Sequence, residues 1–175
     1  MLIALPNLDG SFTCTLFMPF EGENSFASLT NRKQVEDFFE KNLPDTVDVI
    51  PNLAEDFFKN PTSTLVTMKC FPWTFENKVA LIGDACHAIV PFYGQGMNAG
   101  FEDITVLHEF MEEFGDDWEE IFKAYEKSRK PDADAIAELS YRNFMEMSSK
   151  TADESFLLRK KIEKRFSEKY PDKWL

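Results

Sequence analysis

The chain is poor in cysteine, histidine and long apolar runs, and each scarcity excludes a class of protein. Three cysteines without a CxxC spacing give no disulfide framework, so we expect a reduced, cytoplasmic protein. The two histidines, His87 and His108, have no zinc-type partner spacing, and we predict no metal site. No apolar run approaches the roughly 20 residues that cross a bilayer, so we expect no membrane segment.

Basic residues are scarce in the first part of the chain. Residues 1–122 hold 21 Asp and Glu against 6 Lys and Arg, whereas residues 123–175 hold 10 against 13. Nucleic-acid binding needs Lys and Arg gathered on one face, so the net charge of −12 argues against nucleic acid and against an anionic membrane surface. The basic residues of 159–165 interleave with Leu158, Ile162 and Phe166. This pattern predicts an amphipathic docking helix, with membrane contact as the alternative.

The periodicity of apolar residues predicts strands first and helices later. Residues 1–7 and 11–20 are rich in β-formers and flank a turn, which predicts a hairpin. Helices are expected over 31–42 and 51–59, and strands over 63–71 and 78–84. Further helices are expected from about Met97, over 118–130, and from Pro131 onward. The order of elements indicates an α+β fold.

Glycine is rare except in one stretch, GDACHAIVPFYGQGMNAGFED at residues 83–103, which holds four of the seven glycines. Asp84 follows an apolar strand pattern, where ligands of α/β proteins bind. Gly94 and Gly96 permit positive φ and let backbone amides approach a ligand. A helix that begins near Met97 would point its positive end at that ligand. These features favour a ligand with hydroxyl groups and an electron-rich ring that can carry negative charge.

The pattern GDAxHAxxPxxGQGxNxGFED resembles the second flavin-binding motif of the FAD-dependent aromatic hydroxylases. The resemblance implies an enzyme that uses NADPH to reduce FAD and O₂ to hydroxylate an aromatic ring. It implies that Asp84 accepts a hydrogen bond from a ribityl hydroxyl and that the Met97–Asn98 backbone lies beside the pyrimidine end of the flavin. The implied FAD contacts are Gly83, Asp84, Pro91, Gly94, Gly96, Met97 and Asn98.

The segments MLIALPN, SFTCTLFMPFEG, SRKPDADAIAELS and NFMEM narrow the resemblance to the branch of that family that hydroxylates L-kynurenine. It implies an apolar substrate pocket and a polar contact from Asn143 to the substrate's amino-acid end. The implied apolar lining is Ile3, Leu5, Phe17 and Phe92. It also implies three parts: a substrate-binding sheet part with short helices (1–75), the flavin-contacting strand–loop–helix with following helices (76–130), and a C-terminal helical segment (131–175).

The GxGxxG fingerprint with which such hydroxylases open is absent from the sequence. We therefore expect a C-terminal fragment that is inactive alone, needs the N-terminal half as partner and self-associates without it. We assign no catalytic residue, because Cys86 has no neighbouring base that would make it a nucleophile. Two alternatives remain: a flavin-free interaction module that keeps the fold without turnover, and a related hydroxylase with another aromatic substrate.

Overall fold

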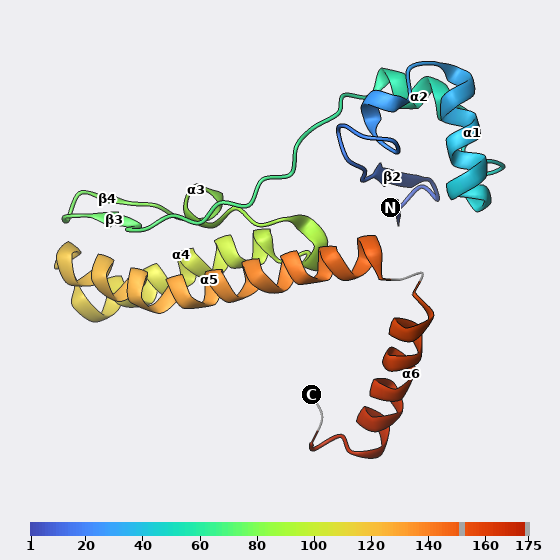
Figure 1. Ribbon diagram of the computed structural model, residues 1–175. Coiled ribbons are helices and arrows are strands. Elements are labelled where there is room, and N and C mark those ends of the chain that lie inside the picture. Colours follow the sequence, from blue (N-terminus) through green and yellow to red (C-terminus); the bar gives the residue numbers. More distant parts are fainter. Residues whose placement is uncertain (151–152, 174–175) are drawn as a thin grey trace. The chain divides into compact units, whose positions relative to one another are not determined.

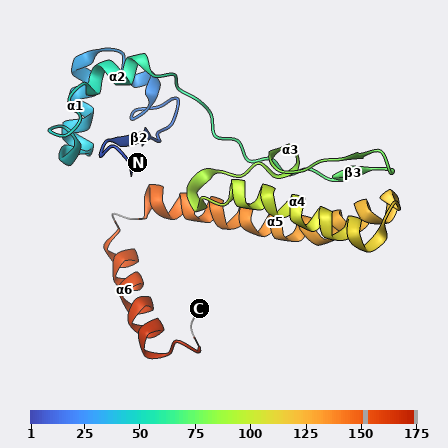
Figure 2. The same cartoon turned by 180° about the vertical axis from the view of Figure 1, so that it is seen from behind.

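The computed structural model describes residues 1–150 and 153–173, which form two compact units, Met1–Thr64 and Leu65–Leu175. Figures 1 and 2 show the elements of each unit from opposite sides. Helices outweigh strands, and the strands come early in each unit, so the α+β prediction is confirmed. In the part of the chain that the structure describes, no helix is both long and apolar enough to span a bilayer.

The first unit opens with the predicted hairpin. Strand β1 (Leu2–Pro6) pairs antiparallel with β2 (Phe12–Leu16), in a register that sets Leu2 opposite Leu16 and Pro6 opposite Phe12. The turn between them is closed by Asp9, whose carboxylate accepts a hydrogen bond from the Ser11 backbone N–H at 3.0 Å. Gly10 lies in this turn with φ of +84°, a backbone conformation that favours glycine.

Two helices cover the remainder of the first unit. A 3₁₀ turn, η1 (Phe26–Ser28), precedes α1 (Arg32–Asn42); a second, η2 (Pro44–Thr46), leads to α2 (Leu53–Lys59). Asn31 caps α1 by accepting from the Gln34 N–H at 3.1 Å, as the sequence predicts. The hydrophobic core consists of Leu29, Val35, Phe39 and Ala54, and the side chain of Ser25 is also fully buried in this unit.

The second unit begins with an extended segment and a short hairpin, β3 (Thr74–Phe75) with β4 (Val79–Ala80). A single helical turn, α3 (Asp84–His87), and a 3₁₀ turn, η3 (Pro91–Tyr93), lead to the long helices α4 (Gly96–Phe114) and α5 (Trp118–Ser149). Helix α6 (Glu154–Lys169) covers the basic segment and confirms the helix predicted there. In Figures 1 and 2, α4 runs alongside α5.

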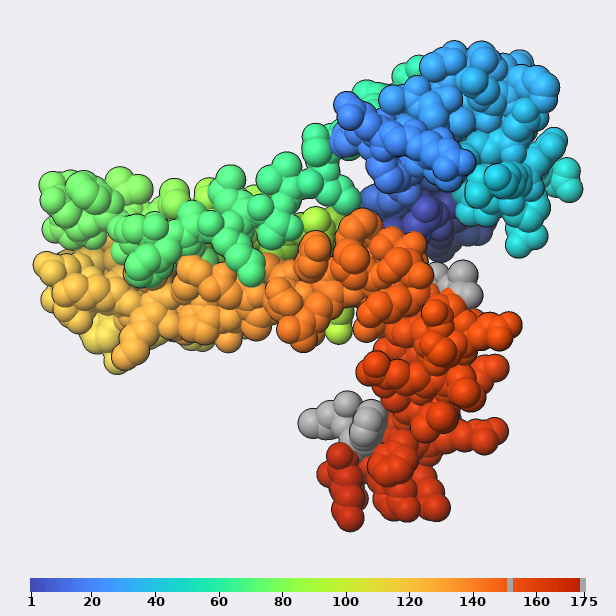
Figure 3. All heavy atoms as spheres, viewed as in Figure 1, coloured from blue at the N-terminus to red at the C-terminus, as the bar shows by residue number. Residues whose placement is uncertain are grey.

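The predicted strand at 63–71 is wrong. Residues 63–71 have an extended backbone, but no strand is assigned to them. The backbone N–H of Met68 donates to the carbonyl of Ala88 at 2.7 Å, and one such bond does not make a ladder. Figure 3 shows the segment after residue 65 lying over α5, where Leu65 and Val66 remain exposed. A β-rich sequence forms a strand only where a second strand supplies hydrogen bonds.

Two other expected boundaries differ. The strand predicted over 78–84 is only β4, and Asp84 opens α3 rather than ending a strand. The break predicted at Pro131 does not occur, because Pro131 lies within the continuous helix α5. Its side chain is exposed, and proline there forgoes one backbone hydrogen bond without burying an unpaired group.

Candidate functional site

The turn before Asp84 is tight and depends on glycine. Gly83 has φ of +61° and precedes α3, so the Asp84 carboxylate sits at the start of one helical turn. Gly100 of α4 lies directly opposite, since a Cβ built on Gly100 would come within 3.7 Å of the Gly83 Cα. The turn therefore packs backbone to backbone against α4, and a larger residue at 83 would also strain the left-handed conformation.

The loop after α3 leads into the N-terminus of α4. Gly94 takes φ of +66° after η3, as predicted, but Gly96 is the first residue of α4 and has no positive φ, so that prediction is wrong. Gly96 instead keeps space beside Ile89, whose Cγ1 would lie 3.6 Å from an added Cβ. Among residues 1–150 and 153–173, no side chain caps α4, because Gln95 at the N-cap position makes no cap hydrogen bond. The first amides of α4 are therefore available to a ligand.

The turn, the loop and the start of α4 surround a first hollow of about 570 Å³. Its wall contains six of the seven residues that the sequence assigned to the flavin, and Asn98 is the exception. Among the described residues, none donates a hydrogen bond to the exposed Asp84 carboxylate, which remains an open acceptor on this wall. The lining residues are Gly83, Asp84, Ile89, Pro91, Gly94, Gly96, Met97 and Gly100.

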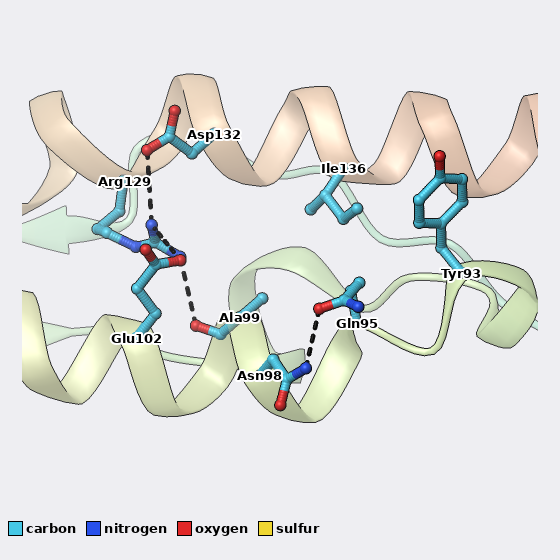
Figure 4. A pocket seen from close by; sticks show the side chains of 8 residues that line it. All are labelled: Tyr93, Gln95, Asn98, Ala99, Glu102, Arg129, Asp132 and Ile136. Carbon is cyan, nitrogen blue, oxygen red and sulfur yellow. Dashed lines mark hydrogen bonds and ion pairs between the residues drawn. The ribbon is translucent and has the colours of Figure 1, made fainter. Parts of the chain in front are cut away.

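A second hollow of about 330 Å³ lies between α4 and α5 (Figure 4). The Asn98 side chain is on this side, where its amide donates to Gln95 Oε1 at 2.9 Å, so only its backbone can serve the first hollow. The guanidinium of Arg129 reaches across from α5 and contacts the carboxylates of Glu102 at 2.9 Å and Asp132 at 3.6 Å. The opposing charges are therefore largely paired within the chain.

A fully buried ionic cluster joins α3, α4 and α5. Asp103 accepts hydrogen bonds from His87 Nε2 at 2.5 Å and from Arg129 Nε at 2.9 Å. Burial alone would raise the pKa of Asp103, but the hydrogen bonds from His87, the Gly83 backbone and Arg129 outweigh it and lower that pKa. The hydrogen bond to Asp103 raises the pKa of His87 against the opposing effect of burial. Asp103 is therefore the charged centre of the cluster.

Cys86 lies beside His87 and Asp103, and the three ligand atoms are within 4.8 Å of one another. Metal binding would need a thiolate, yet burial and the nearby Asp103 charge raise the pKa of Cys86 to about 12. The thiol donates instead to the Gly83 carbonyl at 3.3 Å. Both oxygens of Asp103 already accept hydrogen bonds. The arrangement suits a hydrogen-bonded core better than a metal centre.

Aromatic residues pack around this cluster. The Trp73 ring packs against His87 in a tilted arrangement with ring centroids 5.3 Å apart, and its backbone N–H donates to Glu126 of α5 at 2.5 Å. Tyr125 donates its hydroxyl to the Leu81 carbonyl at 3.1 Å, and burial raises the pKa of that hydroxyl. These contacts join the segment before Asp84 to the N-terminal part of α5. Helix α5 therefore supports the turn at Gly83 through packing and hydrogen bonds.

The residues assigned to the substrate fall in both units. In the first unit, the strand register places Ile3, Leu5 and Phe17 on one face of the hairpin, where Ile3 is half-buried and Leu5 is exposed. In the second unit, Phe92 is buried and stacks on Phe144 with ring centroids 4.6 Å apart. Asn143 donates its side-chain amide to the Phe92 carbonyl at 2.5 Å.

The sequence reasoning left out two central residues. Asp103 is part of the quoted motif, and its position one helical turn beyond Gly100 on a helix packed behind the loop was the available signal. Arg129 had no local signal, because its place beside Asp103 depends on how α5 packs against α4. His87, a histidine without zinc-type partner spacing in the sequence, is buried in the structure and bonds Asp103.

Comparison with known proteins supplies the family. A family model described as "FAD binding domain" matches residues 29–140. The kynurenine 3-monooxygenase of Flavobacterium johnsoniae is 83% identical over all 175 residues, and that of Dictyostelium discoideum is 47% identical over the whole chain. The Christiangramia forsetii protein of the same name is 67% identical over 99% of the chain. The chain spans about two fifths of the length of these relatives, 39% to 41%.

Proposed function

The chain belongs to the FAD-binding-domain family, and from that premise we propose that it is part of an FAD-dependent monooxygenase acting on L-kynurenine. The complete enzyme would use NADPH and O₂ to hydroxylate the kynurenine ring next to its amino group. FAD, when bound, supplies the redox chemistry and the activation of O₂. The task of this chain is to hold the flavin ring system and to form part of the substrate pocket.

The observation that carries the proposal is the first hollow, whose wall combines an open carboxylate acceptor with an uncapped helix N-terminus. Asp84 can accept a hydrogen bond from a ribityl hydroxyl of FAD. The amides at the start of α4 can stabilise the negative charge that reduction places on the flavin ring. Gly94 and Gly96 leave room for the ring to approach the backbone. The chemistry of the donor set fits a flavin.

The substrate contacts rest on the two sets of residues assigned from the sequence. The apolar face formed by Ile3, Leu5 and Phe17 suits the aromatic ring of kynurenine. The Asn143 amide nitrogen donates to the Phe92 carbonyl and to Met147 Sδ, so its Oδ1 is the atom that would accept a hydrogen bond from the substrate's ammonium group. In this proposal Phe92 supplies a ring edge or backbone next to the substrate.

Exposed apolar side chains of the second unit suggest surfaces that a protein partner would cover. Met97, Phe101 and Ile104 follow one face of α4 and are all more than half exposed, and the extended segment exposes Leu65 and Val66. We propose that the remaining part of the enzyme covers these surfaces, and that the chain by itself would associate with copies of itself. We also propose a cytoplasmic location, because the free cysteines suit a reducing compartment.

Two other functions remain as alternatives. A flavin-free interaction module would keep the fold and bind no FAD, and a related hydroxylase would oxidise another aromatic substrate. The 83% identity to a kynurenine 3-monooxygenase favours the kynurenine enzyme over both. Visible absorbance of bound flavin in the purified full-length protein separates the module from the enzymes, and product analysis with kynurenine and other aromatic acids separates the two enzymes.

The test uses the full-length protein with two single substitutions. Asp84→Ala removes a charged acceptor worth roughly 1.5–3 kcal/mol, so the Kd for FAD should rise about tenfold or more. Leu5→Ala should raise the KM for kynurenine and leave the Kd for FAD unchanged, because Leu5 lies on the substrate face of the hairpin. Leu8→Ala is the matched control, since Leu8 is fully exposed in the turn of the same hairpin.

The proposal fails if the full-length protein binds no flavin, or if it binds flavin and does not convert kynurenine to its hydroxylated product. The residue assignment fails separately if Asp84→Ala leaves FAD affinity unchanged. It also fails if Leu5→Ala and Leu8→Ala have equal effects on the KM for kynurenine.

A further inference from the structure

Three charged side chains are buried behind the first hollow, and none of them lines it. Asp103 is 0% exposed, Arg129 is 2% exposed and His87 is 3% exposed. Burial of charge is costly unless each charge is paired and hydrogen-bonded, so a cluster of this kind is retained for a structural or functional reason. Its contacts indicate which part of the molecule it serves.

Asp103 connects the cluster to the wall of the hollow. Its Oδ2 accepts a hydrogen bond from the backbone N–H of Gly83 at 2.9 Å, and His87 Nε2 bonds the same oxygen. Gly83 lines the hollow and directly precedes Asp84. Because Gly83 holds a left-handed backbone conformation, its N–H direction and the direction of the following residue are set together. The bond to Asp103 therefore fixes how the turn presents the Asp84 carboxylate.

Arg129 connects the same carboxylate to the start of α4. Its Nε donates to Asp103 Oδ1 at 2.9 Å, while Nη2 donates to the carbonyl of Ala99 at 3.3 Å. Ala99 lies in the first turn of α4, whose earlier residues Gly96 and Met97 line the hollow. One planar guanidinium thus spans two groups with fixed geometry. Asp103 and Arg129 therefore fix the position of the turn at Gly83 relative to the N-terminus of α4.

We propose that Asp103 is a positioning residue of the flavin site, which sets the turn at Gly83 against the start of α4 and is itself held by Arg129 and His87. This inference rests on the proposed function. It adds that residues outside the hollow determine flavin affinity by fixing the distance between the ribityl acceptor and the uncapped helix amides. The His87 ring acts through Nε2 alone, because its Nδ1 has no hydrogen-bond partner among the described residues.

The test measures FAD affinity and stability separately in the full-length protein. Asp103→Asn keeps the shape of the side chain and removes the charge that orders the Gly83 N–H, Arg129 and His87. We expect the Kd for FAD to rise about tenfold and the visible absorption band of the bound flavin to shift, because the charged hydrogen bonds are lost. The free energy of unfolding of the flavin-free protein is measured in parallel by urea titration.

Phe122→Leu is the matched control. Phe122 is buried on the same helix as Arg129 and packs on Trp118, with ring centroids 5.6 Å apart. It should lower the stability of the protein and leave the Kd for FAD within about twofold, since a change of one buried apolar side chain does not reach the loop. A role in stability alone would make Asp103→Asn behave like this control.

Arg129→Lys is the second variant, for use if Asp103→Asn does not fold. It keeps a cation beside Asp103 but cannot also donate to the Ala99 carbonyl, so the Kd for FAD should rise several-fold. The inference is overturned if the variants that fold bind FAD within about twofold of the parent. If Asp84→Ala weakens FAD and these variants do not, the inference fails and the proposed function stands; if the parent binds no FAD, both fail.

Discussion

The two units of the chain build their cores in different ways. The core of Met1–Thr64 is formed by the uncharged side chains of Leu29, Val35, Phe39 and Ala54, and the hydroxyl-bearing Ser25 is buried in the same unit. The core of the second unit contains Trp73, Tyr125 and the ionic cluster of His87, Asp103 and Arg129. An apolar core tolerates repacking, whereas an ionic core demands one arrangement of its partners. The part of the molecule with the most demanding side-chain geometry therefore lies next to the proposed flavin loop.

The proposed ligand site of the second unit is also more completely formed than that of the first. In the second unit, six of the seven residues assigned to FAD surround one hollow, which the continuous segment of residues 83–100 forms with support from α5. In the first unit, the hairpin face of Ile3, Leu5 and Phe17 is an open two-stranded surface. The flavin contacts are therefore locally determined, while a substrate pocket on that face needs further walls. Two substitutions and a change of pH test this difference between the units.

The largest effect is expected at Arg129. Arg129→Met leaves the Asp103 carboxylate buried without its cation and should lower the free energy of unfolding by about 3–5 kcal/mol. The double variant Arg129→Met/Asp103→Leu should recover much of that loss, because neither charge is then buried. Urea unfolding of the full-length protein measures both. Equal stability of the single variant and the parent would contradict an ionic core.

A smaller effect is expected at Val35 in the apolar core. Val35 is completely buried, so Val35→Ala should lower the free energy of unfolding by roughly 2 kcal/mol through lost apolar burial and a small cavity. Hydrogen exchange read by mass spectrometry should show the loss of protection in peptides of residues 29–59. FAD affinity should not change, and a weakened FAD complex would show that the two cores are coupled.

The smallest effect is expected from pH. Because Asp103 raises the pKa of His87 above its ordinary 6.5, protonated His87 stabilises the fold. That contribution is present below pH 6.5 and is lost as the pH rises through the raised pKa. Arg129 opposes the shift, while Cys86 and Tyr125 keep raised pKa values and stay neutral near pH 7.

His87→Gln tests this pH dependence, because glutamine can donate to Asp103 and does not titrate. Stability of this variant should be flat over the window where the parent loses stability. Unfolding followed by urea titration at several pH values gives the comparison. The lowered pKa of Asp103 acts at the acid end, where its contribution is present above pH 3.8 and is lost as the pH falls through the lowered value. A parent profile as flat as that of His87→Gln would mean that His87 is neutral in the fold.

Local pattern was sufficient where an element stabilises itself. The hairpin has its own turn chemistry in Asp9 and Gly10, and α1 has its own cap in Asn31. The motif at 83–103 likewise encodes a tight turn and a helix start in consecutive residues. The sequence could therefore group residues that line one hollow, and their assignment to a flavin stays a prediction. It could not predict Arg129, which is 26 residues away from Asp103 and meets it only through helix packing.

What the sequence alone determined is thus the local chemistry: the turn at Gly83, the open Asp84, the helix that begins at Gly96 and the alternation of the hairpin faces. Packing decided which β-rich runs became strands, since residues 63–71 make no ladder with a second strand. It also decided that α5 continues through Pro131 and brings Arg129 to Asp103. Turns, caps and glycine conformations depend on residues that are close together in the sequence. Sheet ladders and buried ion pairs need groups that are distant in the sequence and that only packing brings together.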